Sequence, residues 1–488
     1  MFRTLLEKEL KAIILSPKFA TTFLACSILI LLSVFVGIKD YQSAIRQYET
    51  ATQLTDQQIR ESTSWHGVNN RAFRKPDPMQ IFVSGVNNDI GRYSIIHSSQ
   101  SVKLQNSNYS DDPIFAVFRY IDLTFIFQVV LSLFAILFTF DAINGEREGG
   151  TLQLTFANAV PRAKYLMAKF IGSLIALIVP LLIPLLLGCM LLLVFRVPLT
   201  SDHWLRLLVW LGVSFLFFTT FVSMGLLISA LVRRSAVSFL ISLVVWVVFV
   251  LIIPRASVIA AGQFISVPSV GEIDGQQDGF AKQRWDNYRD ELMARWQERS
   301  VTMEGMDEDE REAFRDDNEW GWMQEDDKAR NAVEQDIDEF SRKLLEDVRN
   351  RRQVQERMAF TLSRFSPASA YQLAAMNLGG TNITLKSRYE DAMNNYRGTF
   401  KQYVAKKQEE GGGRGGIRIT ISSETGFSMS SSRDKGTLDV TDLPRFEASI
   451  LGNLEAISPT IIDFGLLAFY TILSFAGAFV AFLRYDVR

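Results

Sequence analysis

The residues best suited to chemistry form one short charged segment. Residues 139–154 read TFDAINGEREGGTLQL, which places carboxylates, an arginine and two adjacent glycines between long apolar stretches. Asp141 or Asn144 can begin a short helix here, Glu146 and Glu148 suit its first turn, and the glycines that follow break or bend it. A short charged helix beside a membrane is a docking surface, and its carboxylates would orient the docked protein. The alternative is ordinary solvation of both carboxylates at a helix end.

No catalytic motif accompanies this segment. The sequence has no GxxxxGK[ST], GxSxG or HExxH pattern, and its three histidines, His66, His97 and His203, are scattered. We therefore expect a chain that is not an enzyme, with no histidine-based metal site and no bound cofactor.

Two stretches resemble ligand-binding loops only in part. Residues 307–310 are acidic, but they lack the alternation and the glycine of a calcium-binding EF-hand loop, which favours a solvated helix face. The glycine run at 411–416 lacks the Lys-Ser/Thr of a P-loop. It is followed by the strand-like alternation of Ile417–Ile421, so we interpret it as a flexible hairpin tip or linker.

The elements that position the charged segment are membrane spans. Hydrophobic residues make up 48% of the 488-residue chain and charged residues 21%, and the two kinds are segregated. Both cysteines lie in apolar stretches, which excludes a disulfide framework. We predict a mainly α membrane protein with a small β element. Its six transmembrane helices are expected at 19–38, 120–143, 170–195, 204–232, 236–253 and 461–483.

Basic flanks indicate the orientation of these spans. Lys and Arg concentrate in residues 1–18, in the loop 144–169, at Arg233 and Arg234, and in the tail 484–488. In a six-span chain these segments share one side, which the positive-inside rule makes cytoplasmic. The predicted location is the plasma membrane, as a bacterial inner-membrane protein with both termini in the cytoplasm. The insertions at 39–119 and 254–460 would then be extracytoplasmic.

The N-terminal residues 1–18 have the pattern of an amphipathic helix. Phe2, Leu5, Leu6 and Leu10 recur at helical spacing opposite basic residues, so this helix can lie in the headgroup plane before Pro17. The alternative is a short helix packed on the bundle with no part in force transfer.

The two insertions are expected to be largely helical. The first should begin with a helix that continues the first span through Tyr41 to Arg60. In the second, 286–364 reads as long charged helix and favours an extended helical hairpin, and 387–410 predicts another helix. Between them, 365–375 predicts a small amphipathic helix whose apolar face would rest on the outer membrane surface.

A few polar residues and prolines mark the predicted spans. Pro180 and Pro184 should kink the third span, and a gating role is the less favoured alternative. Asp122 and Arg119 lie one helical step apart and favour an ion pair at the membrane rim over a transport site. Asp463 should lie near water at the outer end of the sixth span.

The charged segment resembles a motif of permease subunits of type-2 ABC transporters. Residues 146–152, EREGGTL, are similar to the Glu-(Arg/Lys)-Glu-x-Gly-Thr-Leu motif of the loop between the second and third spans, and Pro161-Arg162 corresponds to the Pro-Arg before the third span. The chain ending at 482–488 and the segment 442–446 resemble a subgroup with large extracytoplasmic insertions. The resemblance covers the six-span core and the rims of both insertions.

The resemblance implies a set of coupling residues and partners. The implied ATPase-coupling residues are Asn144, Gly145, Glu146, Arg147, Glu148, Gly149, Gly150, Thr151 and Leu152. They would form a coupling helix seated in a groove of a separate ABC ATPase subunit, present in two copies, which would bind ATP and Mg. The N-terminal helix would be the connecting helix beside it. A second copy of the permease, or a homologous one, membrane lipids and an envelope protein are the other partners considered, and no nucleic acid is expected.

Three functions remain open from sequence. The first is the permease subunit of an ATP-driven exporter. The second is an ABC-type mechanotransmitter that acts on an envelope partner through its extracytoplasmic domain, and the third is a structural or sensor membrane protein with no ATPase. The substrate, and the choice between a homodimer and a heterodimer, do not follow from these residues.

Overall fold

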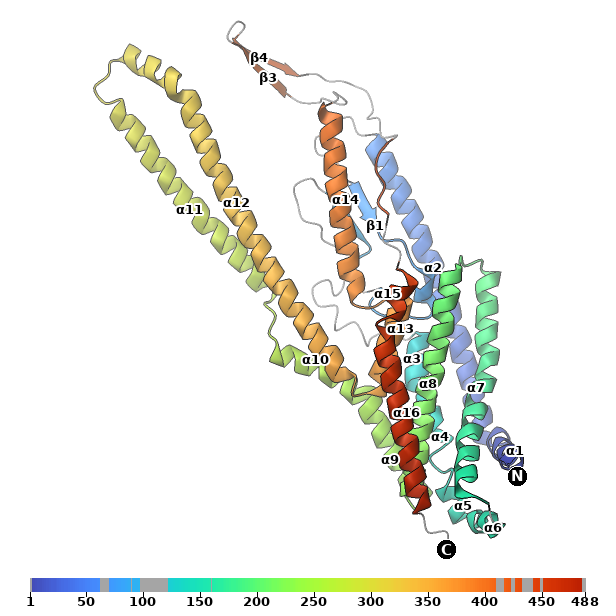
Figure 1. Cartoon of the computed structure of the whole chain (residues 1–488). Coiled ribbons are helices and arrows are strands. Elements are labelled where there is room, and N and C mark those ends of the chain that lie inside the picture. The colour runs from blue at the N-terminus through green and yellow to red at the C-terminus, as the bar shows by residue number, and fades with distance from the viewer. Residues whose placement is uncertain are drawn as a thin grey trace. The chain divides into compact units, whose positions relative to one another are not determined.

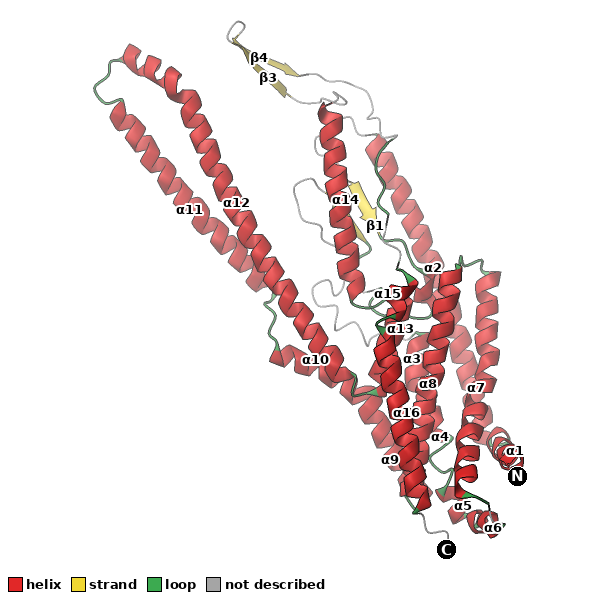
Figure 2. Ribbon diagram, in the orientation of Figure 1, coloured by secondary structure: helices red, strands yellow, loops and turns green. Residues whose placement is uncertain are grey.

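The computed structural model describes residues 2–61, 70–88, 90–96, 122–158, 160–409, 417–422, 426–431, 442–447 and 451–484. It divides into two units (Figure 1). Unit 1 comprises Met1–Ala256 and Ser363–Arg488, and unit 2 comprises Ser257–Leu362. Both are mainly helical, which confirms the predicted fold class (Figure 2).

Unit 1 contains the long apolar helices together with shorter and more polar ones. They are α1 (Phe2–Ile14), α2 (Pro17–Arg60), α3 (Leu123–Phe125), α4 (Ser132–Leu137), α5 (Asn144–Glu148), α6 (Thr151–Ala157), α7 (Arg162–Val194), α8 (Ser201–Leu231), α9 (Ser235–Trp246), α13 (Pro367–Gly379), α14 (Thr384–Glu409), α15 (Asn453–Ile457) and α16 (Thr460–Leu483). Two π-helical segments interrupt them: η3 (Ile126–Leu131) follows α3, and η4 (Val247–Ile252) joins α9 to α10 (Ile253–Phe264).

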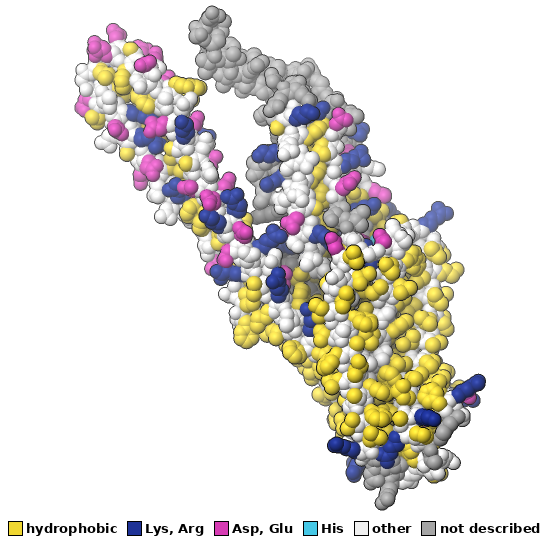
Figure 3. Space-filling model, in the orientation of Figure 1, with side chains coloured by type: hydrophobic (Ala, Val, Ile, Leu, Met, Phe, Trp, Pro, Cys, Tyr) yellow, Lys and Arg dark blue, Asp and Glu magenta, His cyan; other side chains and the backbone are white. Residues whose placement is uncertain are grey.

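Five helices in the described residues are long and apolar enough to cross a membrane. They are Pro17–Arg60, Arg162–Val194, Ser201–Leu231, Ser235–Phe264 and Asn453–Leu483. Of these, Ser201–Leu231 is the central one, since 67% of its most apolar window is buried against 22–28% in the others. On the face shown in Figure 3, hydrophobic side chains cover the helical bundle, and Lys and Arg gather at one end of it.

The predicted second span is shorter than expected. Residues 120 and 121 lie outside the described part, and the helix that begins at Leu123 ends at Leu137 rather than at Ile143. At ~1.5 Å per residue it extends about 22 Å. After it, the Thr139 side chain packs closely on α8 at Gly225, where a Cβ would lie 2.0 Å from the Thr139 hydroxyl oxygen. Gly225 thus leaves room for Thr139, two residues before Asp141 of the charged segment.

The first predicted span continues as one helix, as expected. Ser16 caps α2 by accepting a hydrogen bond from the Phe19 amide at 3.2 Å, Pro17 supplies the first helical residue, and the helix runs to Arg60. α7 runs through Pro180 and Pro184 and begins at Arg162, ahead of the predicted span start at 170. The cytoplasmic loop predicted at 144–169 is correspondingly shorter.

The helix predicted at 365–375 is buried, which corrects its expected position on the membrane surface. Ser366 caps the start of α13, since its hydroxyl accepts hydrogen bonds from the Ala368 and Ser369 amides. Nearly all its residues are buried between α8 and α16, and Tyr371 stacks on Phe217 with ring centroids 4.5 Å apart. Its small Ala and Ser residues let both neighbouring helices approach closely.

Asp463 is also buried, contrary to the expectation that water lies close to it. It is 0% exposed and forms an ion pair with Arg364, whose Nε lies 2.6 Å from its Oδ1. Asp122 likewise binds within the chain: its carboxylate accepts hydrogen bonds from the amides of Phe125 and Ser84 at 2.8 and 2.7 Å. Its predicted partner, Arg119, lies outside the described residues.

The described parts of the insertions also contain two antiparallel strand pairs. In the first insertion, β1 (Asn70–Phe73) pairs with β2 (Tyr93–Ile96), and a 3₁₀ turn η1 (Pro78–Ile81) lies between them. In the second, β3 (Ile417–Ser422), which the sequence predicts, pairs with β4 (Gly426–Ser431). The glycine run at 411–416 lies outside the described residues.

Unit 2 is a helical hairpin, as the charged sequence predicts. α11 (Val270–Thr302) and α12 (Glu308–Ser363) are joined by a turn at residues 303–307. The rings of Phe280 and Phe340 stack with centroids 4.0 Å apart. The Arg299 guanidinium donates a hydrogen bond to the Asp326 carboxylate at 3.0 Å. Asp307 and Glu310, which resemble part of a calcium loop, instead form a capping box at the start of α12.

Candidate functional site

The predicted coupling segment forms two short helices joined by a sharp turn. α5 ends at Glu148, and α6 begins at Thr151. The turn depends on Gly150, which has a left-handed φ of 69° that a side chain would strain. Residues 148–151, Gln153 and Leu154 are exposed, and Leu154 is 68% exposed although it is apolar. These residues form the apex of the segment.

The inner side of the segment is fixed to the bundle. Asn144 is fully buried, and its amide N–H lies 3.4 Å from the Ser229 hydroxyl of α8, which also accepts a hydrogen bond from the Ile143 amide at 3.0 Å. Leu152 of α6 is 0% exposed and anchors this helix on the bundle. Gly145 lies close to Asp141, where a Cβ would approach to 3.3 Å. The exposed apex is therefore held by buried, packed residues on the inner side of the segment, which we call its base.

Glu146 joins three helices. Its Oε1 accepts hydrogen bonds from Lys169 of α7 at 2.9 Å and from Lys8 of α1 at 3.1 Å, and its Oε2 accepts one from the Tyr165 hydroxyl at 2.7 Å. Lys169 also binds Glu9 of α1 at 2.7 Å. Glu9, Lys169 and Glu146 form a charge cluster in which Lys169 and Glu9 have side chains only 7% and 8% exposed.

The cluster shifts the pKa values of its two carboxylates, Glu9 and Glu146, in opposite directions. Burial raises the pKa of Glu9 above its usual value of 4.5, and the attraction of Lys169 offsets this only in part. Burial also opposes ionisation of Glu146, but Lys169, Tyr165 and Lys8 together outweigh it and hold the pKa of Glu146 below 4.5. Glu146 is thus the more firmly ionised partner of Lys169.

Glu148 connects the segment to a fourth helix. It accepts hydrogen bonds from the backbone amide of Ser235 at 3.0 Å and from its hydroxyl at 2.6 Å. Ser235 is the first residue of α9, so the carboxylate satisfies a free amide at a helix N-terminus. These hydrogen bonds lower the pKa of Glu148.

Two more contacts hold the same end of unit 1 together. Lys18 at the start of α2 binds Asp141 at 3.0 Å. Arg162, the second residue of the predicted Pro-Arg pair, donates to the carbonyl oxygens of Phe482 at 3.2 Å and of Leu483 at the end of α16. A cation there complements the negative end of the helix dipole. Figure 1 shows α1, α5, α6 and the end of α16 at one end of the bundle.

The structure therefore redistributes the roles expected from sequence. Glu146 and Glu148 both bind within the chain, Glu146 half-buried and Glu148 exposed, and Gly149, Gly150 and Thr151 are exposed beside Glu148. The sequence reasoning missed Glu9 and Lys169. Signals for both exist: Glu9 falls on the apolar face of α1, four residues from Leu5, and Lys169 falls at the edge of an apolar stretch.

A comparison with protein families gives one decisive match. The family described as ABC-2 family transporter protein matches residues 3–487, which is nearly the whole chain. The chain belongs to the ABC-2 transporter family. No curated protein matches it.

Membership of the ABC-2 family fits the geometry. It makes the chain a multi-pass membrane protein and the membrane subunit of a transporter, and the family is not itself catalytic. An ABC-2 subunit works with an ABC ATPase. In the part of the chain that the structure describes, no group of three or more His, Cys, Asp or Glu residues is placed to hold a metal ion.

Proposed function

We propose that this ABC-2 chain is the permease subunit of an ATP-driven exporter and that the α5–α6 apex docks on a separate ATPase. The observation that carries the proposal is the combination of an exposed apex with an anchored base. Glu146 ties the segment to α1 and α7, and Glu148 ties it to α9. A force applied to the apex therefore reaches three helices at once.

The proposed mechanism needs no chemistry in this chain. The ATPase would hold ATP and Mg, and closure of the ATPase on nucleotide would displace the apex. The bundle would follow because the buried ion pairs at its base resist separation. Nucleotide drives the change only if the ATPase has different affinity for the two arrangements of the permease, as linkage requires.

Several finer features belong to the same proposal. Two permease copies, each with one ATPase, would enclose the path, since one six-span chain cannot do so. The end that carries α1, α5, α6 and the end of α16 would be cytoplasmic, because basic residues concentrate there. We place the complex in the bacterial inner membrane, surrounded by lipid, with the export direction inferred from the type-2 resemblance.

The strongest candidate anchor at the apex is Leu154. An apolar side chain that is 68% exposed at the end of a charged segment is typical of an interface anchor that fills a pocket on the partner. We expect Leu154→Asp to reduce recovery of the ATPase at least about tenfold, since truncation of a hot spot costs roughly 2 kcal/mol or more. The measurement is affinity purification of the tagged chain in mild detergent from cells that express the ATPase.

The chain offers a matched control for this experiment. Leu454 on α15 is 85% exposed, so Leu454→Asp introduces the same charge at an equally apolar exposed site away from the apex. Recovery of the ATPase with this variant should equal that of the wild type. The docking assignment fails if Leu154→Asp retains normal ATPase recovery and normal permease-stimulated ATP hydrolysis.

Unit 2 favours a second function, mechanotransmission to an envelope partner. α12 has 56 residues, which corresponds to about 84 Å at ~1.5 Å per residue. Such a long polar hairpin is suited to carry motion to another protein. Deletion of unit 2 distinguishes the two functions, because an exporter should keep substrate-stimulated ATP hydrolysis, whereas a mechanotransmitter should keep ATPase docking but lose activation of its envelope partner.

A further inference from the structure

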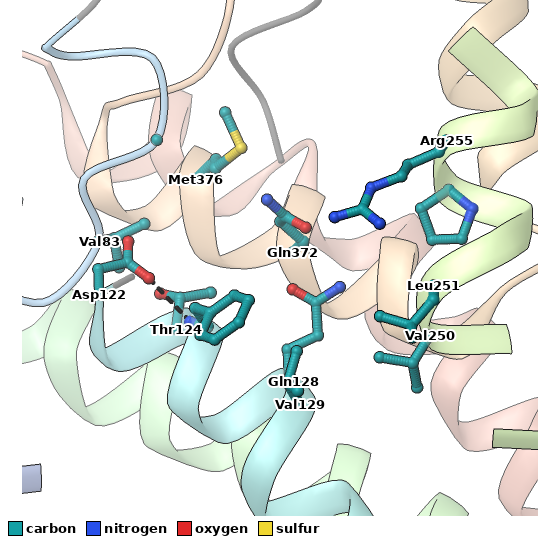
Figure 4. A pocket seen from close by; sticks show the side chains of 13 residues that line it. Val83, Asp122, Thr124, Gln128, Val129, Val250, Leu251, Arg255, Gln372 and Met376 are labelled. Carbon is teal, nitrogen blue, oxygen red and sulfur yellow. Dashed lines mark hydrogen bonds between the residues drawn. The ribbon is translucent and has the colours of Figure 1, made fainter. Parts of the chain in front are cut away.

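A half-open pocket lies in unit 1 between the second and fifth predicted spans. Its cavity volume is about 40 Å³, which is room for a few water-sized groups, and it opens to solvent on one side, so a ligand would place only its charged groups inside it. Its walls come from η3, η4, α13 and the loop at residues 83–85 (Figure 4). Val129, Val250 and Met376 supply apolar surface.

Both π-helical segments of the chain's described part line this pocket. Gln128 belongs to η3, and Val250 and Leu251 belong to η4. The helices beside them are joined by a hydrogen bond at 2.8 Å from the indole of Trp246, the last residue of α9 before η4, to the hydroxyl of Ser132, the first residue of α4 after η3. The π-helix is a rare conformation that recurs at functional sites because it re-aims side chains. Here it turns the amide of Gln128 into the pocket.

Gln128 is a largely buried residue whose side-chain amide opens onto the pocket. The residue is 95% buried, and its side-chain amide forms no hydrogen bond within the described residues. A buried amide without a partner costs free energy unless a ligand or water satisfies it. In Figure 4 the amide of Gln128 points into the same space as the ends of Gln372 and Arg255.

The pocket has opposite charges on its two sides. Arg255 carries a guanidinium that points into it, and among the described residues this group has no ion-pair partner. Asp122 lies on the other side, and its two oxygens each accept one backbone hydrogen bond. Each carboxylate oxygen has a second lone pair and can accept one more. The lining therefore matches a molecule with an anionic end and a cationic end.

We propose that this pocket binds a zwitterion, with its oxyanion against Arg255 and Gln128 and its ammonium group against Asp122. Arg binds phosphate or carboxylate oxygens through paired N–H donors, and the neutral amide of Gln128 can add a third. The headgroup of a phosphatidylethanolamine lipid and a free amino acid share this chemistry. Arg255 is an exposed residue at the open side of the pocket, and its guanidinium points into the pocket in Figure 4.

The test measures binding to the purified full-length chain in detergent, with no ATPase present. The probes are dihexanoyl phosphatidylethanolamine, glycerophosphoethanolamine, 4-aminobutyrate, and dihexanoyl phosphatidylglycerol as the anion without an ammonium group. Binding is followed by isothermal titration calorimetry and by the shift of the thermal unfolding midpoint. We expect a zwitterion to bind at least about tenfold more tightly than the phosphatidylglycerol, because the latter leaves Asp122 without its cation.

Three variants probe the assigned contacts. Arg255→Gln and Asp122→Asn should each weaken binding of the zwitterion at least about tenfold, as expected for loss of a charge-assisted hydrogen bond. Asn retains the ability to cap α3, so Asp122→Asn should remain folded. Gln128→Leu should weaken the oxyanion contact. Arg60→Gln, at the exposed end of α2, is the control and should bind normally.

Each outcome bears on the proposal. Preference for the lipid over glycerophosphoethanolamine and 4-aminobutyrate identifies a membrane lipid, and equal binding of the soluble probes identifies a free zwitterion. Equal affinity for phosphatidylglycerol, absence of binding to any zwitterion, or unchanged binding by both Arg255→Gln and Asp122→Asn overturns the assignment. ATPase docking plays no part in this measurement, so its result is independent of the Leu154 experiment.

Discussion

Lys169 and Glu146 meet at 2.9 Å beneath the α5–α6 apex. Lys169 begins the apolar part of α7, and Glu146 lies on α5. This ion pair therefore joins the segment that we propose receives force from the ATPase to one of the long apolar helices. Glu9 binds the same ammonium group at 2.7 Å and adds α1 to the connection. The rigidity of the apex thus depends on a cation that two carboxylates share.

Removal of the Lys169 ammonium group should strongly destabilise the chain. In Lys169→Met, Glu9 and Glu146 lose their common partner, and breaking a buried ion pair by removing one side typically costs about 3–5 kcal/mol. The free energy of unfolding, measured by SDS titration of the purified chain, should fall by about that amount. The double variant Lys169→Met/Glu9→Gln should recover part of the loss, since one buried carboxylate is neutralised. Equal stability of the single variant and the wild type would contradict the cluster.

The cluster should also give opposite pH dependences for its two carboxylates. The folded-state pKa of Glu146 is below 4.5, so its stabilising contribution is fully present above about pH 4.5 and is lost as pH falls through the folded pKa. The stability difference between wild type and Glu146→Gln should therefore shrink on acidification from pH 6 to pH 3. Thermal unfolding midpoints over that range provide the measurement.

Glu9 supplies the internal control for this titration. Its folded-state pKa is above 4.5, so the folded state holds the proton more tightly and the carboxyl group costs stability as pH rises above that value. Wild type should lose stability relative to Glu9→Gln between about pH 4.5 and pH 7. If the stability difference from wild type changed with pH in the same direction for Glu9→Gln and Glu146→Gln, the pKa values of the two carboxylates would not be shifted in opposite directions.

The close approach of α1 to α7 depends on Gly172. A Cβ at this position would lie 2.8 Å from the Cγ of Glu9, which is shorter than any normal contact. Gly172→Ala should displace α1 and destabilise the chain by roughly 1–3 kcal/mol through overpacking. Limited proteolysis should then cleave α1 faster. Gly212→Ala on α8 is the matched control, since its Cβ meets no described atom within 4 Å and should be neutral.

Local signals explain what the sequence could predict. Ser16 and Pro17 mark the start of α2, and Ser366 and Pro367 mark that of α13, because a capping hydroxyl and a proline at the first helical position act within one turn. The charged hairpin of unit 2 is likewise predictable, since its long run of helix-forming residues has no apolar face wide enough for a core.

Contacts between distant residues explain what the sequence could not predict. Asp463 appeared solvent-accessible because its partner Arg364 lies far away in the chain, and only the packing of α16 brings the two together. α13 appeared to be a surface helix because its small residues are compatible with water or with two close neighbours. Glu146 matches a docking motif in sequence, yet its contacts with Lys8 and Lys169 depend on the positions of α1 and α7.

The orientation of the apex can be tested by cysteine labelling in intact cells. In a background with Cys26 and Cys189 replaced, single cysteines are introduced at exposed positions: Gln153 on α6, Asn88 in the first insertion and Asp317 on α12. We expect an impermeant maleimide to label the Asn88→Cys and Asp317→Cys chains, because both insertions should be extracytoplasmic. Gln153→Cys should react only after the membrane is permeabilised, because the basic residues near α6 resist translocation. Labelling of Gln153→Cys from outside, with cytoplasmic markers protected, would reverse the orientation and remove the apex from reach of any cytoplasmic ATPase.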